Sequence, residues 1–401
     1  MISVPAIIAF LAVILCFLIR ILNLTDRELM PETFDSGSDF VKAIKASCPF
    51  LKEKYVPPVW ARSGHMQTLF ASQVGRVNAP TLLGKHHTVK MKDGATMTFD
   101  VYEPEMTKRE EKLNTIIIVP GIGNCSDTKY VRTFAGYALN HNFRVAVLDH
   151  LGARENIRLT SPRIFTYGST DELRVLVKQV IARYNCHHLI GVGFSMGANV
   201  LLKYLGEKPE RQKNFTCAIS VCQGYDIISA SQLFCDWEGA RRFYSFAMAQ
   251  NMKALILRNE HILFRDPEMC MQKAHVCSAT SLNELDEAFN RRMAHFDDIK
   301  SFYEENSSCK FMTNIKMPVL LLNARDDPII PEQLFASPLK HVEENPQALF
   351  VLTKHGGHLG YYEGGLFGVS KITWMDKSIL QYILAAISIS TIHNFSKASK
   401  S

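Results

Sequence analysis

A serine flanked by two glycines stands where a buried strand would turn into a helix. The sequence Gly-Phe-Ser-Met-Gly over 193–197 follows the apolar run 189–192 and precedes a helix-forming run over 198–205. A tight turn of this kind raises the serine hydroxyl above the sheet edge, and glycines leave space for the neighbouring strand and helix. The amino end of the helix also stabilises negative charge that forms beside the serine. The pattern predicts Ser195 as the nucleophile of an acyl-transfer reaction, rather than a helix-capping serine in a plain turn.

A serine hydroxyl needs a base, and the base needs an acid that orients it. Four residues at expected strand ends follow the serine in the required order of acid and then base: Asp326, Asp327, His355 and His358. We predict His358 as the base, because its glycine-rich loop lets it reach inward, whereas His355 belongs to the strand end. We predict Asp327 as the acid, because it directly precedes Pro-Ile-Ile-Pro, a sequence typical of acid loops after such strands. Asp326 is the alternative, and is otherwise a turn-forming residue.

The oxyanion that forms when a serine attacks a carbonyl group is held by two backbone N–H groups. The first is expected from Met196, directly after the nucleophile. The second is expected after the run 115–119, where Pro-Gly-Ile-Gly-Asn begins at residue 120, and we predict Ile122; a plain glycine turn is the alternative. This mechanism needs no cofactor and no metal. The ten cysteines include no C-x-x-C pair and no zinc-ligand spacing with histidine.

A second pattern, His-x-x-x-x-Asp from His261 to Asp266, can mark acyltransferases. It lies away from the predicted strand ends, and a chain with 14 histidines is expected to contain such a match by chance. We therefore give it no catalytic role.

These residues must be brought together by a large globular fold. The chain has 401 residues, of which 47% are apolar and 21% charged, and these are the proportions of a protein with a sizeable core. The net charge of +6 is not concentrated in a basic run or stripe, which excludes nucleic acid as the expected partner.

The chain after residue 85 alternates between short apolar runs and helix-like stretches. A hairpin joins 86–91 to 96–102, and helix-like stretches lie near 129–140, 171–184 and 196–205. Six runs rich in Val, Ile and Leu cover 115–119, 143–149, 188–194, 217–222, 319–323 and 349–353. Continuous apolar runs suit strands that are covered on both faces. The alternation predicts an α/β fold over 86–392, with a mostly parallel, eight-stranded sheet and helices on both faces.

One long interval, 224–316, breaks this alternation because it contains no clear strand. It is rich in aromatic residues, methionine and charge. Its length favours a helical insertion that caps a pocket at the strand ends, and ordinary amphipathic helices on a sheet face are the alternative.

The N-terminus carries an uncharged apolar run, Ile2 to Ile19, which is closed by Arg20. Its length predicts a transmembrane helix and makes residues 1–24 a membrane anchor; a cleaved signal peptide is the alternative, weakened because no basic segment precedes the run. Residues 25–85 are expected to form a linker and an N-terminal cover. Positive residues after the run favour a cytosolic body, whereas five Asn-x-Ser/Thr sequons favour a non-cytosolic one.

Several long stretches resemble the α/β-hydrolase-domain proteins of the membrane-anchored esterase group, over nearly the whole chain after the anchor. Two examples are Ser-Gly-His-Met-Gln-Thr over 63–68 and His-Gly-Gly-His-Leu-Gly over 355–360. The matching stretches are Trp60 with 63–68, then 120–122, 150–153, 159–168, 220–225 and 355–360. The Gly-x-Ser-x-Gly pattern alone would not separate this group from other hydrolases.

The resemblance implies Ser195 as nucleophile, Asp327 as acid and His358 as base, in agreement with the spacing. It also implies a single-pass membrane protein of type II, with the catalytic domain on the non-cytosolic side and a glycan at Asn124. The implied activity is hydrolysis of lipid esters, namely monoacylglycerols similar to 2-arachidonoylglycerol and short-chain esters, in a way that responds to steroids. A lipid- or steroid-binding receptor with this fold, or an acyltransferase that uses the same acyl-enzyme, is the alternative.

Overall fold

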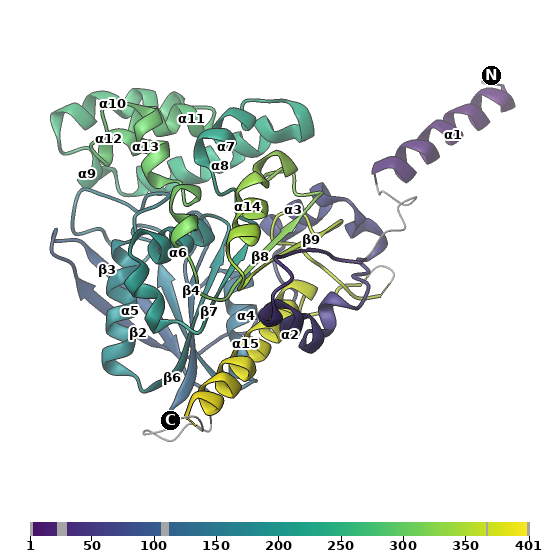
Figure 1. The fold of residues 1–401 in the computed structure, drawn as a ribbon. Coiled ribbons are helices and arrows are strands. Elements are labelled where there is room, and N and C mark those ends of the chain that lie inside the picture. The colour runs from purple at the N-terminus through teal and green to yellow at the C-terminus, as the bar shows by residue number, and fades with distance from the viewer. Residues whose placement is uncertain (1–2, 22–29, 106–111, 366–367, 399–401) are drawn as a thin grey trace.

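The computed structural model describes residues 3–21, 30–105, 112–365 and 368–398. Within these residues one sheet of nine strands crosses the molecule, in the order β1-β9-β8-β7-β6-β4-β5-β3-β2 (Figure 1). Strands β4 to β9 run parallel, while β1, β2 and β3 pair antiparallel towards the two edges. The strands are β1 Glu32–Phe34, β2 Lys85–Lys90, β3 Thr96–Tyr102, β4 Leu113–Val119, β5 Phe143–Asp149, β6 Cys186–Phe194, β7 Cys217–Val221, β8 Val319–Ala324 and β9 Ala348–Thr353.

The mostly parallel α/β fold predicted from the sequence is confirmed, and strands β2 to β9 coincide with the eight predicted runs to within a few residues. The predicted number of strands was wrong by one in the described part of the chain, because β1 joins the sheet at the far side of β9. Glu32 of β1 lies opposite Leu352 of β9. A strand of three residues is too short to show an apolar alternation, so no sequence pattern could reveal it.

Helices cover both faces of the sheet. Successive strand residues point to opposite sides and therefore contact the two helical layers in turn. One face is covered by α2 (Asp39–Ser47), α4 (Lys129–Leu139) and α15 (Trp374–Ala398), and the other by α5 (Asp171–Arg183), α6 (Met196–Glu207) and α14 (Ala336–Glu344). Strand β4 shows the division: Ile116 and Ile118 belong to the first core, Ile117 to the second. These three side chains are fully buried. Each such burial stabilises the fold by about 1.5–3 kcal/mol.

The interval between β7 and β8 is helical throughout its described elements and lies above the carboxyl ends of the strands (Figure 1). We call the helices from α7 to α13 in this interval the cap. They are α7 Ile227–Leu233, η4 Glu238–Ala240, α8 Arg241–Arg258, α9 Glu260–Leu263, α10 Pro267–Ser278, α11 Leu282–Leu285, the π-helical turn η5 Asp286–Asn290, α12 Arg291–Met293 and α13 Ile299–Asn306. Cap residues and sheet residues share one core, so the cap is packed against the body.

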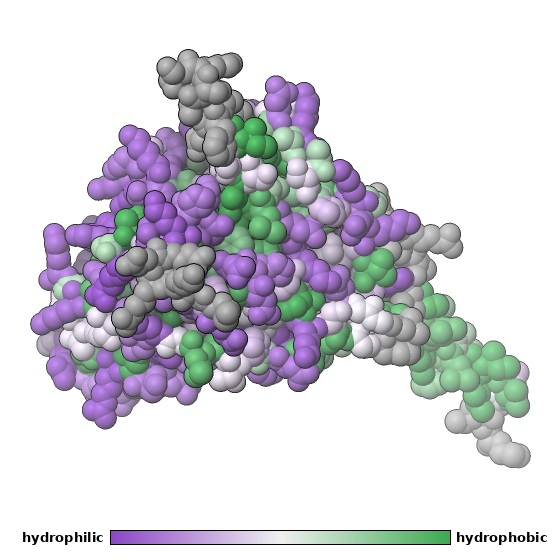
Figure 2. Space-filling model, turned by 90° about the horizontal axis from the view of Figure 1, so that it is seen from below, coloured by the Kyte–Doolittle hydropathy of each residue, from purple (hydrophilic) through white to green (hydrophobic). Residues whose placement is uncertain are grey.

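The N-terminal helix α1 (Val4–Ile21) extends away from the body, and its apolar surface is exposed (Figures 1 and 2). Among the described residues, no helix reaches both the length and the apolarity that crossing a membrane requires. The sequence-based expectation of a transmembrane helix is therefore not supported. The ends of the predicted anchor, residues 1–2 and 22–24, lie outside the described residues.

Much of the segment predicted as a linker and N-terminal cover is built into the body. Besides β1 and α2 it contains α3 (Gly64–Gln73), which lies close to the carboxyl end of β9 (Figure 1). The remaining short helices are η1 Pro49–Leu51, η2 Val59–Arg62, η3 Pro209–Asn214, η6 Cys309–Asn314 and η7 Glu332–Leu334.

Candidate active site

Ser195 occupies the tight turn between β6 and α6 that the sequence predicted. Its backbone has φ +54° and ψ −122°, a conformation that L-residues rarely adopt. A Cβ atom on Gly193 would lie 2.4 Å from Ala198 Cα, and one on Gly197 would lie 2.1 Å from the Val119 carbonyl oxygen. Neither position has space for a side chain, which is the physical reason for the two glycines. The turn is fixed further by a hydrogen bond from Ser195 N to the Val221 carbonyl oxygen, at 2.8 Å.

The predicted base and acid lie in one chain of hydrogen bonds with this serine. His358 Nε2 is 2.9 Å from Ser195 Oγ, and His358 Nδ1 is 2.8 Å from Asp327 Oδ2. Asp327 is 3% exposed, and its other oxygen accepts hydrogen bonds from the backbone N–H groups of Ile329 and Ile330. With Asp327 ionised, Nδ1 donates to the carboxylate, which leaves Nε2 free to accept the serine proton. The arrangement can generate a nucleophilic serine.

The two alternative residues, Asp326 and His355, form a second pair of their own. Asp326 Oδ1 accepts a hydrogen bond from Gly357 N at 2.8 Å, and its Oδ2 lies 3.5 Å from Nδ1 of the buried His355. Burial raises the pKa of Asp326. This pair therefore holds the loop that carries His358, while the backbone turns Asp327 towards the serine.

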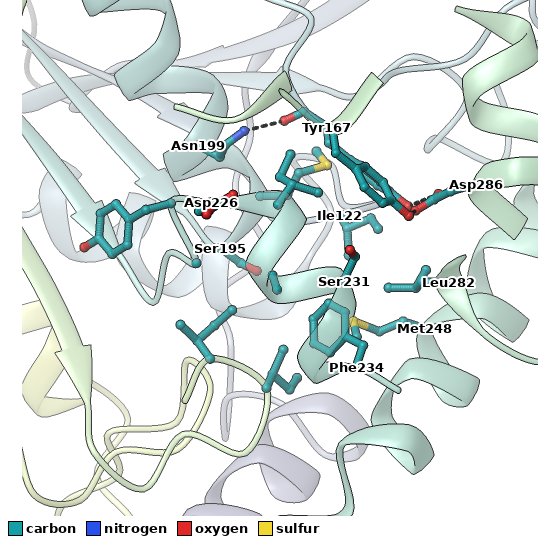
Figure 3. Close-up of a pocket in the computed structure, with 18 of the residues that line it drawn as sticks. Ile122, Tyr167, Ser195, Asn199, Asp226, Ser231, Phe234, Met248, Leu282 and Asp286 are labelled. Carbon is teal, nitrogen blue, oxygen red and sulfur yellow. Dashed lines mark hydrogen bonds between the residues drawn. The ribbon is translucent and has the colours of Figure 1, made fainter. Parts of the chain in front are cut away.

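The loop after β4 faces Ser195, as the predicted oxyanion hole requires. Ile122 and Met196 both line the pocket that contains Ser195 (Figure 3). The loop is held by Tyr130 of α4, whose hydroxyl accepts a hydrogen bond from Gly121 N at 2.8 Å. Burial raises the pKa of Tyr130 to about 12, so the phenol stays protonated. Ile122 and Met196 thus lie where an oxyanion hole is needed. That their backbone N–H groups hold the oxyanion stays a prediction.

Asn124, the predicted glycosylation site, belongs to the same loop. Its Nδ2 donates to the Tyr130 hydroxyl at 3.3 Å, and its backbone N–H donates to the Gly121 carbonyl oxygen at 3.1 Å. The side chain is half-buried, and its hydrogen bond to Tyr130 helps to hold the loop in this conformation. Glycosylation at Asn124 stays a prediction, and a glycan there would have to share Nδ2 with this contact.

An apolar pocket lies beside Ser195, between the strand ends and the cap (Figure 3). The residues that make it apolar include Ile122, Met196, Ile227, Ala230, Phe234, Met248, Leu282, Ile329 and Ile330. Such a lining favours the hydrocarbon part of a substrate. The pocket also contains a buried carboxylate, Asp286, on the cap side.

Sequence reasoning missed the support that the N-terminal segment gives to the base. Thr68 Oγ1 accepts a hydrogen bond from His358 N at 2.9 Å, and Gln67 Oε1 accepts one from Tyr362 N at 3.0 Å. Arg76 donates to the carbonyl oxygens of Leu359 and Gly360. The sequence signal was the stretch 63–68, which carried the family resemblance but had no assigned role.

Within the part of the chain that the structure describes, two groups of side chains bring three potential metal ligands together, and the chemistry of neither group favours a metal. Cys222 lies beside Asp327 and His358, but burial raises the pKa of its thiol, and a metal ligand must be a thiolate. In the group of His86, Asp100 and Asp149, the Arg154 guanidinium already lies 3.0 and 3.2 Å from the two carboxylates.

The His-x-x-x-x-Asp pattern has a structural role in the cap. Asp266 caps α10 by accepting hydrogen bonds from Glu268 N and Met269 N, and His261 is exposed on α9. Neither residue lines the pocket of Ser195.

A family model described as the alpha/beta hydrolase fold matches residues 114–365. The chain is 40% identical to Monoacylglycerol lipase ABHD2 of Homo sapiens over 382 residues, which cover 94% of this chain and 90% of the relative. It is 37% identical to Abhydrolase domain-containing protein 2 of Drosophila melanogaster, with 94% and 96% covered. It is 25% identical to Phospholipase ABHD3 of Homo sapiens, with 89% and 85% covered.

Proposed function

Because the chain belongs to the α/β-hydrolase family, we propose that it is a serine hydrolase that cleaves carboxylic esters of lipids. The observation that carries the proposal is the unbroken chain of hydrogen bonds from Asp327 through His358 to Ser195, at the wall of an apolar pocket. The names of the curated relatives, two monoacylglycerol lipases and a phospholipase among them, support a lipid ester as substrate.

The proposed reaction has two halves. Ser195 Oγ attacks the ester carbonyl carbon while its proton moves to His358 Nε2, and the N–H groups of Met196 and Ile122 stabilise the oxyanion. The tetrahedral intermediate collapses as His358 gives its proton to the leaving alcohol, and an acyl-enzyme remains. Water then attacks the acyl group, with His358 again as base, and the fatty acid leaves. Asp327 stabilises the imidazolium that forms in each half.

We propose a monoacylglycerol, with 2-arachidonoylglycerol as the type of substrate, as the preferred ester, and short-chain esters as weaker substrates. The support is the apolar lining of the pocket and the names of the relatives at about 40% identity. Activation by a steroid ligand, which the family resemblance implies, stays a prediction. It is checked by titrating progesterone into the hydrolysis assay with and without Ser195→Ala.

We propose that α1 attaches the enzyme to a lipid surface. Val4, Phe10 and Phe17 are 69%, 66% and 63% exposed, and so large an apolar surface is unfavourable in water. The single-pass type II topology with a non-cytosolic catalytic domain stays a prediction. It is checked by a shift in electrophoretic mobility after peptide N-glycosidase treatment, with Asn124→Gln as control.

The decisive experiment labels the full-length protein with a fluorophosphonate, which reacts with activated serines, and measures fatty acid release from a monoacylglycerol. Wild type is expected to be labelled and active, and Ser195→Ala to lose both. A folded wild type without label would contradict the proposal and favour a lipid-binding receptor. Transfer of the acyl group to added glycerol or lysolipid, in place of fatty acid release, would instead identify an acyltransferase.

A further inference from the structure

Two carboxylates, Asp226 and Asp286, are among the residues that line the mostly apolar pocket of Ser195 (Figure 3). Asp226 caps α7, because it accepts hydrogen bonds from the backbone N–H groups of Ile228 and Ser229. Asp286 is 2% exposed, and three side chains donate hydrogen bonds to it. Tyr167 Oη is 2.5 Å and Asn290 Nδ2 is 2.6 Å from its Oδ1, and Tyr303 Oη is 2.8 Å from its Oδ2. Asp286, Tyr167 and Tyr303 all line the pocket, and we call these three residues the acceptor cluster.

The direction of these hydrogen bonds, from donor to acceptor, determines which groups of a ligand the cluster can bind. A phenol has one proton, and both tyrosines give theirs to Asp286, so each has only acceptor capacity left. Asn290 Nδ2 also donates to Tyr167 Oη at 3.3 Å, which uses part of the acceptor capacity of that phenol. Burial raises the pKa of Asp286 to about 6, which leaves the carboxylate mostly ionised at neutral pH. An ionised carboxylate also only accepts hydrogen bonds. The acceptor cluster therefore presents acceptors, and no donor, to a ligand in the pocket.

Stability alone gives no reason for this cluster. Its residues come from the loop after β5, from the π-helical turn η5 of the cap and from α13. A buried ionised group is costly, and an apolar contact between cap and body would stabilise the fold at least as well. A π-helical turn inside an otherwise α-helical stretch also occurs frequently at functional sites.

We propose that the acceptor cluster binds the free hydroxyl groups of the glyceryl part of a monoacylglycerol, and so selects this ester over esters of simple alcohols. Each free hydroxyl of a glyceryl ester carries a proton that can be donated to Asp286 or to one of the phenol oxygens. The apolar wall accommodates the hydrocarbon part. This inference rests on the proposed function, because it assumes that an ester reaches Ser195.

The test compares two esters with the same acyl chain, monooleoylglycerol and methyl oleate, on the full-length protein. We expect wild type to have the higher kcat/KM for monooleoylglycerol. In Asp286→Asn and in Tyr303→Phe the ratio of the two kcat/KM values should fall about tenfold, because each variant removes an acceptor, the carboxylate or a phenol oxygen, for a substrate hydroxyl. The kcat/KM for methyl oleate should change little by comparison.

The matched control is Tyr184→Phe, which removes a phenol bonded to His87 at the far edge of the sheet. It should leave the ratio at the wild-type value. Equal losses on both esters in Asp286→Asn and Tyr303→Phe, or a wild type without preference, would overturn the inference and leave the cluster a structural link between cap and body. Failure of wild type to hydrolyse either ester would instead overturn the proposed function. Tyr303→Phe keeps the test valid if Asp286→Asn does not fold.

Discussion

The backbone strain at Ser195 gives a prediction at the scale of one residue. The φ of +54° costs an L-residue about 1–3 kcal/mol, and glycine avoids most of this cost while losing some entropy on folding. We expect Ser195→Gly to be more stable than Ser195→Ala by about 1 kcal/mol, although both lack the hydroxyl and both should be inactive. Urea unfolding of the two variants measures the difference. Equal stabilities would show that the turn is not strained in solution.

Asp286 predicts a dependence of stability on pH. Burial raises its pKa from 3.8 to about 6, so the folded protein binds a proton that the unfolded chain has already released between these values. The free energy of unfolding should therefore fall as pH rises from about 4 to about 6, by on the order of 3 kcal/mol for this group. Urea unfolding at several pH values, with wild type and Asp286→Asn compared, isolates the effect. A constant difference between the two proteins would contradict the raised pKa.

Tyr130 should act on the reaction without touching the substrate. Its hydroxyl fixes Gly121 N, so Tyr130→Phe frees the loop that carries Ile122. We expect kcat to fall about tenfold with KM nearly unchanged, because the loss concerns an oxyanion that exists only in the transition state. Tyr137→Phe, on the same helix, is the control. A rise in KM with constant kcat would mean that Tyr130 serves substrate binding.

At the scale of the elements, α3 supports the catalytic loop from outside the parallel sheet. Thr68→Ala leaves the His358 N–H without its acceptor, and we expect a loss of about 1–3 kcal/mol of stability together with a lower kcat. Thr68→Ser keeps the hydroxyl and should restore both. Thermal unfolding and the hydrolysis assay check this. A Thr68→Ser variant as impaired as Thr68→Ala would point to packing of the methyl group instead.

The elements also show what the sequence could predict. Strands β4 to β9 carry apolar runs, and Ser195, Asp327 and His358 follow three of these strands. The apolar pattern and the chain order were therefore sufficient to predict that these three residues lie together. The acceptor cluster joins three segments between residues 167 and 303, and only the packing of the cap onto the body places them side by side. The contact of Thr68 with His358 spans 290 positions and left no periodic signal for the same reason.

At the scale of the whole molecule, α1 is separated from the catalytic body (Figure 1). Removal of residues 1–29 should therefore leave kcat/KM for a water-soluble short-chain ester unchanged, because the described contacts around Ser195 begin with α3. The truncated protein should no longer float with phosphatidylcholine vesicles in a density gradient. Flotation without these residues would show that another surface binds lipid.

The two edge strands of the sheet, β1 and β2, carry features that oppose pairing with a second sheet. At one edge of the sheet β1 is only three residues long, and its Glu32 forms a bidentate ion pair with Arg325. At the other border β2 exposes Lys85, His86 and Lys90 along its length. Short strands and like charges at a border oppose the docking of a second sheet. Concentrated solutions of the folded protein should accordingly resist growth into β-linked aggregates.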